Sequence, residues 1–317
     1  MVRVAAVDCG TNSIRLLVSD YSDGTFTDIY RGMKIVRLGQ GVDATGRIAE
    51  DSIIRARVAL AEFVDIMRRE HVAALRMVAT SATRDAENRQ EFIDMTAELL
   101  SKVIPGAKAE EITGAEEAEL SFRGAVTDLS ASSNTICVID LGGGSTEFVV
   151  GKRDGEVLGA ESVQLGCVRL TERVMTEDPA TPEQVAEARA LVAQRLADVQ
   201  SNVPIAQADT FVGVAGTFTT ISALAQGLET YDPAHIHGSE LNFAATEVLT
   251  RQLIEMPAAT RAAHPVMHPG RADVIGGGAV VVDGIIDMIS SCTDVRSFII
   301  SEKDILDGIV AGLISSE

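Results

Sequence analysis

Short apolar runs alternate along the chain with longer segments in which apolar residues recur at helical spacing. Val2–Val7, Leu75–Ala79 and Thr210–Val214 are apolar runs of strand length, and such runs are typical of strands that are buried on both faces. Asp51–His71 instead carries apolar residues every three or four positions, which predicts an amphipathic helix. Because strands and helices alternate, the pattern predicts an α/β fold.

Two of the expected helices begin with recognisable caps. Thr113 and Thr181 are each followed three residues later by Glu or Gln, which is the spacing of a capping box, and Pro182 suits the first helical position. The other expected elements are strands at Ile14–Val18, Lys34–Leu38, Ala109–Ile112, Gly159–Leu165 and Ser297–Ile300, and helices at Ala86–Val103, Thr113–Val126, Thr181–Asn202, Arg271–Met288 and Asp304–Ile314. Gly276–Gly278 fall inside one of these helices, so close packing or a ligand must offset their cost.

One polar motif occurs twice, each time directly after an apolar run. Asp8–Ser13 reads D-C-G-T-N-S, and Asp140–Glu147 reads D-L-G-G-G-S-T-E, so both contain D-x-G-x-x-S. Glycines let successive backbone N–H groups converge on phosphate oxygens. A nearby carboxylate suits a divalent cation that shares those oxygens. Either loop alone could be an ordinary tight turn, but the second copy favours a pair of phosphate-binding hairpins.

The repeat divides the chain into two domains of similar topology, 1–127 and 128–303. Asp128–Asn134 is rich in serine and small residues, and it reads as the hinge. The closing helix, within 304–317, is expected to pack back on the first domain.

Composition and charge narrow the class of protein. The chain of 317 residues carries a net charge of −19, which argues against binding to nucleic acid or to an anionic membrane surface. No apolar run of about 18 residues predicts a membrane span, and no signal peptide is seen at the start, so a cytoplasmic location is expected. The four scattered cysteines predict neither a disulfide framework nor a zinc site. The scattered histidines are interpreted as surface or packing residues.

Two charged residues near strand ends are candidates for chemistry. Arg84 follows the strand Leu75–Ala79, and ligands bind at such strand ends in open α/β sheets, although a surface cation is the alternative. The Thr113 capping box assigns Glu116 to the helix start and leaves Glu117 in the first helical turn. On spacing alone, the interpretation that both glutamates simply serve the helix start is the stronger one.

A rival motif overlaps the first hairpin. Cys9–Arg15 matches C-x5-R, the loop of phosphatases that use a cysteine nucleophile. That loop should lead into a helix, whereas the residues after Arg15 have strand character, and Leu141 replaces Cys9 in the second copy. Cys9 is therefore interpreted as a small residue at a strand end.

The motifs in combination resemble the exopolyphosphatase and guanosine pentaphosphate phosphatase family, over nearly the whole chain. The resemblance implies two ribonuclease-H-like, actin-like domains around an inter-domain cleft. It implies that Glu117 is the catalytic base, which reverses the preference drawn from spacing. It further implies a metal, Mg²⁺ or Mn²⁺, at Asp140, Glu147 and Asp8. The implied phosphate-binding residues are Gly10, Thr11, Asn12, Ser13, Arg15, Arg84, Gly142, Gly143, Gly144, Ser145, Thr146, Gly216 and Thr217.

The activity implied is hydrolysis of the terminal phosphate of linear polyphosphate by attack of water. Hydrolysis of guanosine pentaphosphate would use the same residues. A small-molecule kinase and a sensor that binds guanosine tetraphosphate are alternatives of other classes. A homodimer is possible, and no nucleic-acid or membrane partner is expected.

Overall fold

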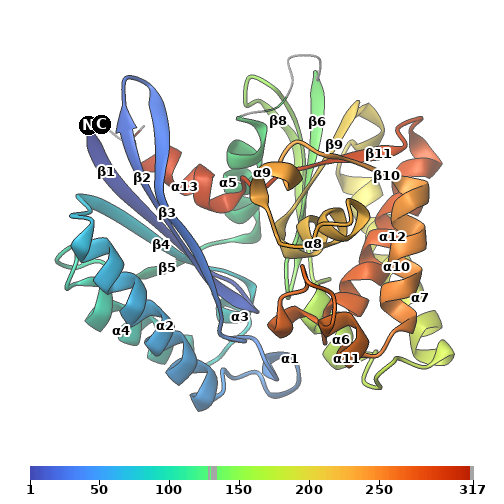
Figure 1. The fold of residues 1–317 in the computed structure, drawn as a ribbon, viewed down its shortest axis with the longest axis horizontal. Coiled ribbons are helices and arrows are strands. Elements are labelled where there is room, and N and C mark those ends of the chain that lie inside the picture. The colour runs from blue at the N-terminus through green and yellow to red at the C-terminus, as the bar shows by residue number, and fades with distance from the viewer. Residues whose placement is uncertain (128, 130–133, 315–317) are drawn as a thin grey trace. The chain divides into compact units, whose positions relative to one another are not determined.

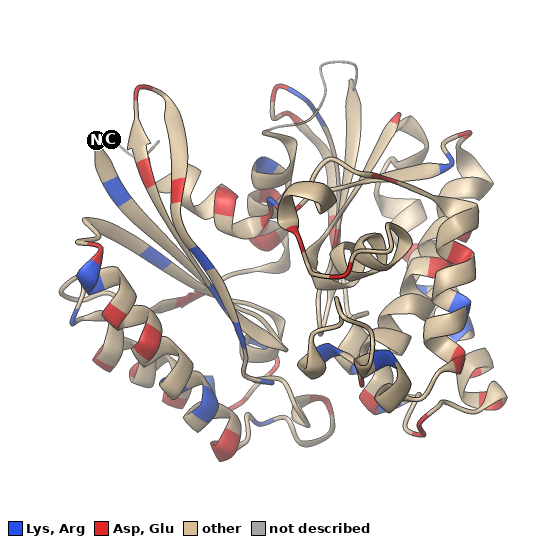
Figure 2. Ribbon diagram, in the orientation of Figure 1, with Lys and Arg blue, Asp and Glu red and all other residues tan. Residues whose placement is uncertain are grey.

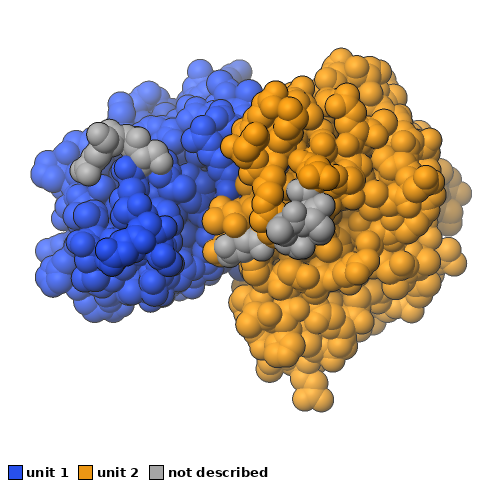
Figure 3. Space-filling view, turned by 90° about the horizontal axis from the view of Figure 1, so that it is seen from above, with its two compact units in different colours: residues 1–124, 305–317 blue, residues 125–304 orange. Residues whose placement is uncertain are grey.

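The computed structural model describes residues 1–127, 129 and 134–314. The chain forms two compact units, shown in different colours in Figure 3. Unit 1 consists of Met1–Gly124 and the C-terminal stretch from Ile305, and unit 2 is Ala125–Asp304. The expected hinge, Asp128–Asn134, falls mostly on residues outside the described part of the chain.

Unit 1 is built on a five-stranded mixed sheet with the order β3-β2-β1-β4-β5. Strand β2 is antiparallel to both of its neighbours, β1 and β3, whereas β4 and β5 continue the sheet parallel to β1. The strands are β1 (Val2–Cys9), β2 (Ser13–Ser22), β3 (Thr25–Ile35), β4 (Ala74–Ala79) and β5 (Ala109–Glu111). The helices are α1 (Val42–Thr45), α2 (Glu50–Arg69), α3 (Ser81–Arg84), α4 (Arg89–Leu100), α5 (Gly114–Val126) and α13 (Ile305–Ile314).

Strand β1 has an unbroken apolar stretch from Val4 to Val7 because helices cover both faces of the sheet. Ala5 and Val7 point into a core shared with α2 and α4. Val4 and Ala6, which alternate with them, point into a second core shared with α5 and α13. Side chains alternate between the faces of a strand, so the continuous apolar run records burial on both sides.

Unit 2 repeats this plan with one strand more. Its six-stranded sheet has the order β10-β11-β9-β6-β7-β8. The strands are β6 (Thr135–Leu141), β7 (Thr146–Lys152), β8 (Val157–Val163), β9 (Thr210–Val214), β10 (Glu240–Asn242) and β11 (Ser297–Ile300). The helices are α6 (Cys167–Arg173), α7 (Pro182–Asn202), α8 (Ala215–Ala225), α9 (Pro233–Ile236), α10 (Phe243–Glu255), α11 (Ala258–Ala262) and α12 (Ile275–Cys292), with 3-10 turns at Ile205–Gln207 and Pro269–Arg271.

The two units share one topology, visible in Figure 1. In each, an antiparallel three-stranded meander begins with the central strand, and the fourth strand pairs parallel to the first. This arrangement confirms the predicted α/β class and the predicted likeness of the two halves.

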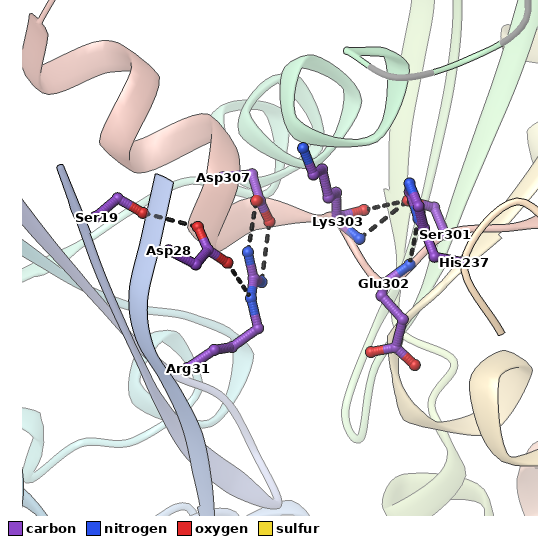
Figure 4. A network of polar contacts seen from close by, with 8 residues as sticks. All are labelled: Ser19, Asp28, Arg31, His237, Ser301, Glu302, Lys303 and Asp307. Carbon is purple, nitrogen blue, oxygen red and sulfur yellow. Dashed lines mark hydrogen bonds and ion pairs between the residues drawn. The ribbon is translucent and has the colours of Figure 1, made fainter. Parts of the chain in front are cut away.

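Polar contacts anchor both sides of the segment by which the chain returns to unit 1 (Figure 4). In unit 1, Arg31 on β3 holds Asp307 of α13 through two hydrogen bonds of 2.6 and 3.1 Å, and its Nε donates to Asp28. In unit 2, the backbone N–H of Glu302 donates to His237 Nδ1 at 3.2 Å. Helix α13 also packs against β1, β2 and β4.

Three expectations about individual elements need correction. Lys34–Leu38 is not a separate strand, because β3 ends at Ile35 and the next residues form a loop. Glu116 completes no capping box: its backbone N–H binds the Thr113 hydroxyl, but its carboxylate pairs with Arg76 at 2.6 Å. The second box, Thr181 with Gln184, is confirmed.

The third correction concerns α12, because the sequence was expected to contain no apolar run of membrane-spanning length. This helix is long and apolar enough to cross a membrane by length and composition alone, and 72% of it is buried inside the structure. Its side chains form much of the core of unit 2, so burial within the unit accounts for its hydropathy.

The acidic residues responsible for the negative net charge are spread over the elements of both units (Figure 2).

Candidate phosphate-binding site

The first hairpin joins β1 to β2 through the expected glycine motif. Asp8 lies at the end of β1 opposite Arg15 on β2, and the backbone N–H of Gly10 donates to the carbonyl of Ser13 at 3.0 Å. A loop after β3 backs this turn. There, the N–H of Gly39 donates to the carbonyl of Thr11, and the N–H groups of Val36 and Arg37 donate to the carbonyl of Asn12.

The second hairpin, between β6 and β7, has the same construction. Asp140 lies opposite Glu147, and the N–H of Gly142 donates to the carbonyl of Ser145, again at 3.0 Å. The start of α6 backs this turn, since the N–H of Cys167 donates to the carbonyl of Gly142 and those of Val168 and Arg169 donate to Gly143. Arg169 Nε donates to the carbonyl of Gly144 at 2.7 Å.

The backing segments decide which way the hairpin amides point. In a trans peptide, the C=O and the following N–H lie on opposite sides of the chain. Because the carbonyls of Gly142, Gly143 and Gly144 are held by α6, the N–H groups of the next residues are directed away from it. The same holds for Asn12 and Ser13, whose preceding carbonyls bind the loop after β3. Each hairpin thus presents consecutive backbone donors, which is the arrangement that binds anions.

Each backing segment contains a glycine where the two backbones come close. A Cβ at Gly166 would lie 2.4 Å from the carbonyl carbon and oxygen of Gly143, and a Cβ at Gly39 would lie 2.3 Å from Cγ2 of Thr11. The close approach on which the carbonyl contacts depend therefore requires glycine at both positions.

The cross-strand partners differ between the two hairpins. Asp8 accepts hydrogen bonds from Arg15 Nη2 at 2.7 Å and Nε at 3.0 Å, so a cation already neutralises this carboxylate. Asp140 instead faces a second carboxylate, Glu147, and both are buried. Ser162 on β8 donates to Glu147 Oε1 at 2.7 Å and orients it.

The carboxylates of Asp140 and Glu147 and the consecutive backbone amides of the second hairpin suit a hard divalent cation that binds together with phosphate. Mg²⁺ typically takes only one or two protein carboxylates, and water and phosphate oxygens complete its shell. Two buried carboxylates opposite each other repel unless a cation or proton intervenes. No group of three or more His, Cys, Asp and Glu side chains suited to a metal occurs in the described part of the chain. A metal held by Asp140 and Glu147 would therefore need oxygens of a bound phosphate to complete its shell.

Arg84 and Glu117 meet in unit 1. Arg84 ends α3, directly after β4, and its Nη1 donates to Glu117 Oε2 at 2.6 Å and to the carbonyl of Ile112 at 3.1 Å. Glu117 is only 8% exposed. The Nη2 of Arg84 is buried and has no hydrogen-bond partner within the described residues, although buried donors are normally satisfied.

Gly216 and Thr217 open α8 at the end of β9. Arg271 Nη1 donates to the carbonyl of Gly216 at 3.2 Å, and its guanidinium occupies the space where a Gly216 side chain would begin. The residue before, Ala215, has a φ of 67°, which is uncommon for a residue with a Cβ and marks a constrained turn.

Burial disfavours the thiolate form of the two cysteines that lie beside the hairpins, Cys9 and Cys167. Burial raises the pKa of the Cys9 thiol well above its usual value, and the charge of Asp8 raises it further. Burial also raises the pKa of Cys167 to about 11. The loop after Cys9 leads into strand β2, as expected for a residue at a strand end and contrary to the C-x5-R alternative.

Sequence reasoning placed both hairpins but missed what supports them. The loop Val36–Gly39, the segment Gly166–Arg169, Ser162 and Arg271 were not assigned to the site. A glycine shortly after the third strand of each copy, Gly39 and Gly166, is the signal that could have found the backing segments.

The protein is an α/β protein of duplicated architecture. Its two units share one topology, and each has a glycine hairpin after its first strand. The chain belongs to the Ppx/GppA phosphatase family, whose model matches residues 17–317. It is 50% identical over 317 residues to the protein named Exopolyphosphatase 2 of Mycobacterium tuberculosis, with 99% of each chain covered.

Solved structures agree with this assignment. A crystal structure described as an exopolyphosphatase-like protein is similar with a TM-score of 0.92 and 41% identity, covering 98% of each chain. The crystal structure of the Aquifex aeolicus member of the Ppx/GppA family has a TM-score of 0.78 and 28% identity, and it covers 100% of this chain and 99% of its own.

Proposed function

We propose that the protein is an exopolyphosphatase, which releases the terminal phosphate of linear polyphosphate by attack of water. The observation that carries the proposal is the pair of hairpins whose carbonyls are tied back so that consecutive amides are presented. Such amides bind phosphate oxygens without any particular organic group, as a purely inorganic substrate requires. The name of the mycobacterial relative supports the choice of substrate.

In this proposal, Asp140 and Glu147 hold Mg²⁺ or Mn²⁺ together with phosphate oxygens. When bound, the metal supplies positive charge that neutralises the phosphate chain. Asp8 is left out of the metal site, because Arg15 already binds its carboxylate. The amides of Gly143, Gly144 and Ser145 hold oxygens of the same chain.

Glu117 is the proposed proton acceptor. Its ion pair with Arg84 favours the ionised carboxylate, and only an ionised carboxylate can accept a proton. Arg84 also has a buried Nη2 without a partner in the described chain, and a phosphate oxygen of the substrate would satisfy it. One guanidinium then positions both the base and the group that is attacked.

The reaction follows from these roles. A water oxygen forms a bond to the terminal phosphorus, and its proton passes to a carboxylate oxygen of Glu117. The bond from that phosphorus to the bridging oxygen breaks, and the bridging oxygen leaves on the shortened chain. Positioning and charge neutralisation supply most of the rate enhancement in phosphoryl transfer.

Glu117→Gln tests the proposal, with Glu116→Gln as a matched control from the same helical turn. Glu116 pairs with Arg76 and has no assigned role. Phosphate release from tripolyphosphate with Mg²⁺ should fall about 10²–10⁴-fold in Glu117→Gln, as is usual for loss of a general base, whereas the control should stay within about twofold. Near-normal turnover of Glu117→Gln would refute the assignment.

The same assay separates the alternative functions. Longer polyphosphate, guanosine pentaphosphate and ATP are compared with tripolyphosphate at equal concentration. Release from guanosine pentaphosphate alone would shift the function to that substrate. Transfer to an added acceptor would indicate a kinase, and no release from any substrate would indicate a sensor.

A further inference from the structure

Helix α12 begins with three glycines that helix formation does not explain. Glycine is the poorest helix former after proline, yet Gly276, Gly277 and Gly278 all lie within its first turn and are buried. A Cβ at Gly277 would lie 2.6 Å from Thr171 Oγ1 and 2.8 Å from the carbonyl oxygen of Cys167. A Cβ at Gly278 would lie 2.8 Å from both Cγ2 and Oγ1 of Thr217. The start of α12 therefore contacts α6 and α8 at closer range than any side chain allows.

Two of the three contacted residues, Cys167 and Thr217, belong to the candidate site or its supports. Cys167 begins α6 and donates its N–H to the carbonyl of Gly142 at 3.1 Å. Thr217 lies in the turn after β9, and a Cβ at Gly278 would meet both its side chain and the Cβ of Cys167, the latter at 3.2 Å. A path of contacts thus runs from the second hairpin through Cys167 and Gly278 to the Gly216–Thr217 turn, and Gly277 lies against Cys167 as well.

We propose that Gly277, Gly278 and Cys167 are positioning residues, which set the spacing between the second hairpin and the Gly216–Thr217 turn so that both bind one phosphate chain. The inference rests on the proposed function, because it concerns how that substrate is held. Packing alone would require close approach somewhere along α12, but not both at the helix that holds the second hairpin and at the turn that carries the Thr217 hydroxyl.

Gly284 in the same helix provides a matched control. A Cβ there would lie 2.4 Å from Cγ1 of Val192 and 3.2 Å from Cδ1 of Leu196, so alanine is crowded against α7 and touches no residue of the site. Overpacking at either position should lower the melting temperature. Only Gly278→Ala should disturb phosphate binding.

The first experiment compares Gly278→Ala with Gly284→Ala. Melting temperatures are measured with and without tripolyphosphate and Mg²⁺, and KM and kcat are measured for the same substrate. Gly278→Ala should lose about 10²-fold in kcat/KM, the effect of a misplacement near 1 Å, together with most of the ligand-induced rise in melting temperature. Gly284→Ala should keep that rise and a kcat/KM within about twofold of the wild type. Equal losses in the two variants would overturn the proposal.

A second pair of variants avoids steric crowding altogether. Cys167→Ala removes the sulfur of the residue that lies between the second hairpin and Gly278, and Cys167→Ser keeps a side chain of similar size. Cys292→Ala is the control, because that thiol caps the end of α12 away from the site, where it donates to the carbonyl of Met288. Cys167→Ala should raise KM for tripolyphosphate about fivefold, because the packing that spaces the hairpin and the Gly216–Thr217 turn is loosened, with kcat little changed.

Recovery of KM in Cys167→Ser, with no change in Cys292→Ala, supports positioning by Cys167. An unchanged KM in Cys167→Ala overturns its part in the proposal. If the wild type releases no phosphate, the proposed function fails on its own. The ligand-induced change in melting temperature still decides whether the glycines position a phosphate-binding site.

Discussion

The two hairpins have the same backbone hydrogen-bond pattern but differ in the charge of their side chains. Both are closed by the same 3.0 Å hydrogen bond across the turn, and both are backed by a glycine-bearing segment that follows the third strand of the unit. Yet Asp8 faces Arg15, whereas Asp140 faces Glu147. A single cross-strand position therefore sets the aspartate opposite a cation in one turn and opposite a second carboxylate in the other. Duplicated loops can keep the amides that bind an anion while only one of them keeps the charge that attracts a cation.

The largest effect is expected from the acidic hairpin. Asp140→Asn should lower kcat/KM about 10³-fold, because metal charge neutralisation is worth several kcal/mol. The Mg²⁺ concentration for half-maximal activity should rise as well. Titrating Mg²⁺ in the phosphate-release assay measures both quantities. Activity that falls without any change in metal dependence would place the metal elsewhere.

A smaller effect should follow from crowding the backing segments, and it should differ between the hairpins. Alanine at Gly166 would meet the backbone of Gly143 at 2.4 Å, whereas alanine at Gly39 would meet the methyl group of Thr11. Gly166→Ala should therefore cost about 10²-fold in kcat/KM. The loss in Gly39→Ala should be partly recovered by Thr11→Ser, which removes that methyl group. Kinetics of the three variants would show the contrast, and equal, unrecoverable losses would contradict it.

Breaking the ion pair between Asp8 and Arg15 should lower stability more than it affects metal binding. Asp8→Asn takes away the negative charge that faces Arg15, whose side chain is 20% exposed. The expected loss in the free energy of unfolding is about 1–3 kcal/mol, measured by urea denaturation. The Mg²⁺ dependence of activity should match that of the wild type. A shifted Mg²⁺ requirement would return Asp8 to the metal site.

The smallest effect is expected at Cys9, whose equivalent in the second hairpin is Leu141. Cys9→Ser should retain activity within about twofold and lose about 1 kcal/mol in stability, because a hydroxyl is buried where a thiol was. Activity and melting temperature are measured on the same preparation. Loss of all activity in a folded variant would revive a cysteine nucleophile, although the raised pKa of this thiol argues against one.

Much of the fold and both hairpins could be predicted from local signals. A repeated D-x-G-x-x-S after an apolar run specifies a strand, a turn and a carboxylate within a few residues, and the expected strands Thr210–Val214 and Ser297–Ile300 coincide with β9 and β11. The Lys34–Leu38 run was misleading. Its apolar residues Val36 and Leu38 are buried in a loop whose amides bind the first hairpin rather than a neighbouring strand.

The remainder of the candidate site depends on contacts between distant residues. Glu116 pairs with Arg76, whereas the adjacent Glu117 pairs with Arg84. The spacing at the helix start does not reveal this difference between the two glutamates. Arg271 reaches Gly216 from a different loop. No local pattern encodes such meetings, because they arise only when the sheets bring strand ends together.

The interrupted course of unit 1 has a consequence for biosynthesis. The ribosome makes β1 to β5 first, but α13, which covers one face of their sheet through Ile305, Ile309 and Val310, is made only after the whole of unit 2. Val4, Ala6, Leu17 and Val78 lack this cover until then. Such surfaces invite aggregation when they are exposed in a nascent chain. The N-terminal half therefore matures last, and shortening the chain from its far end would damage the part that is synthesised first.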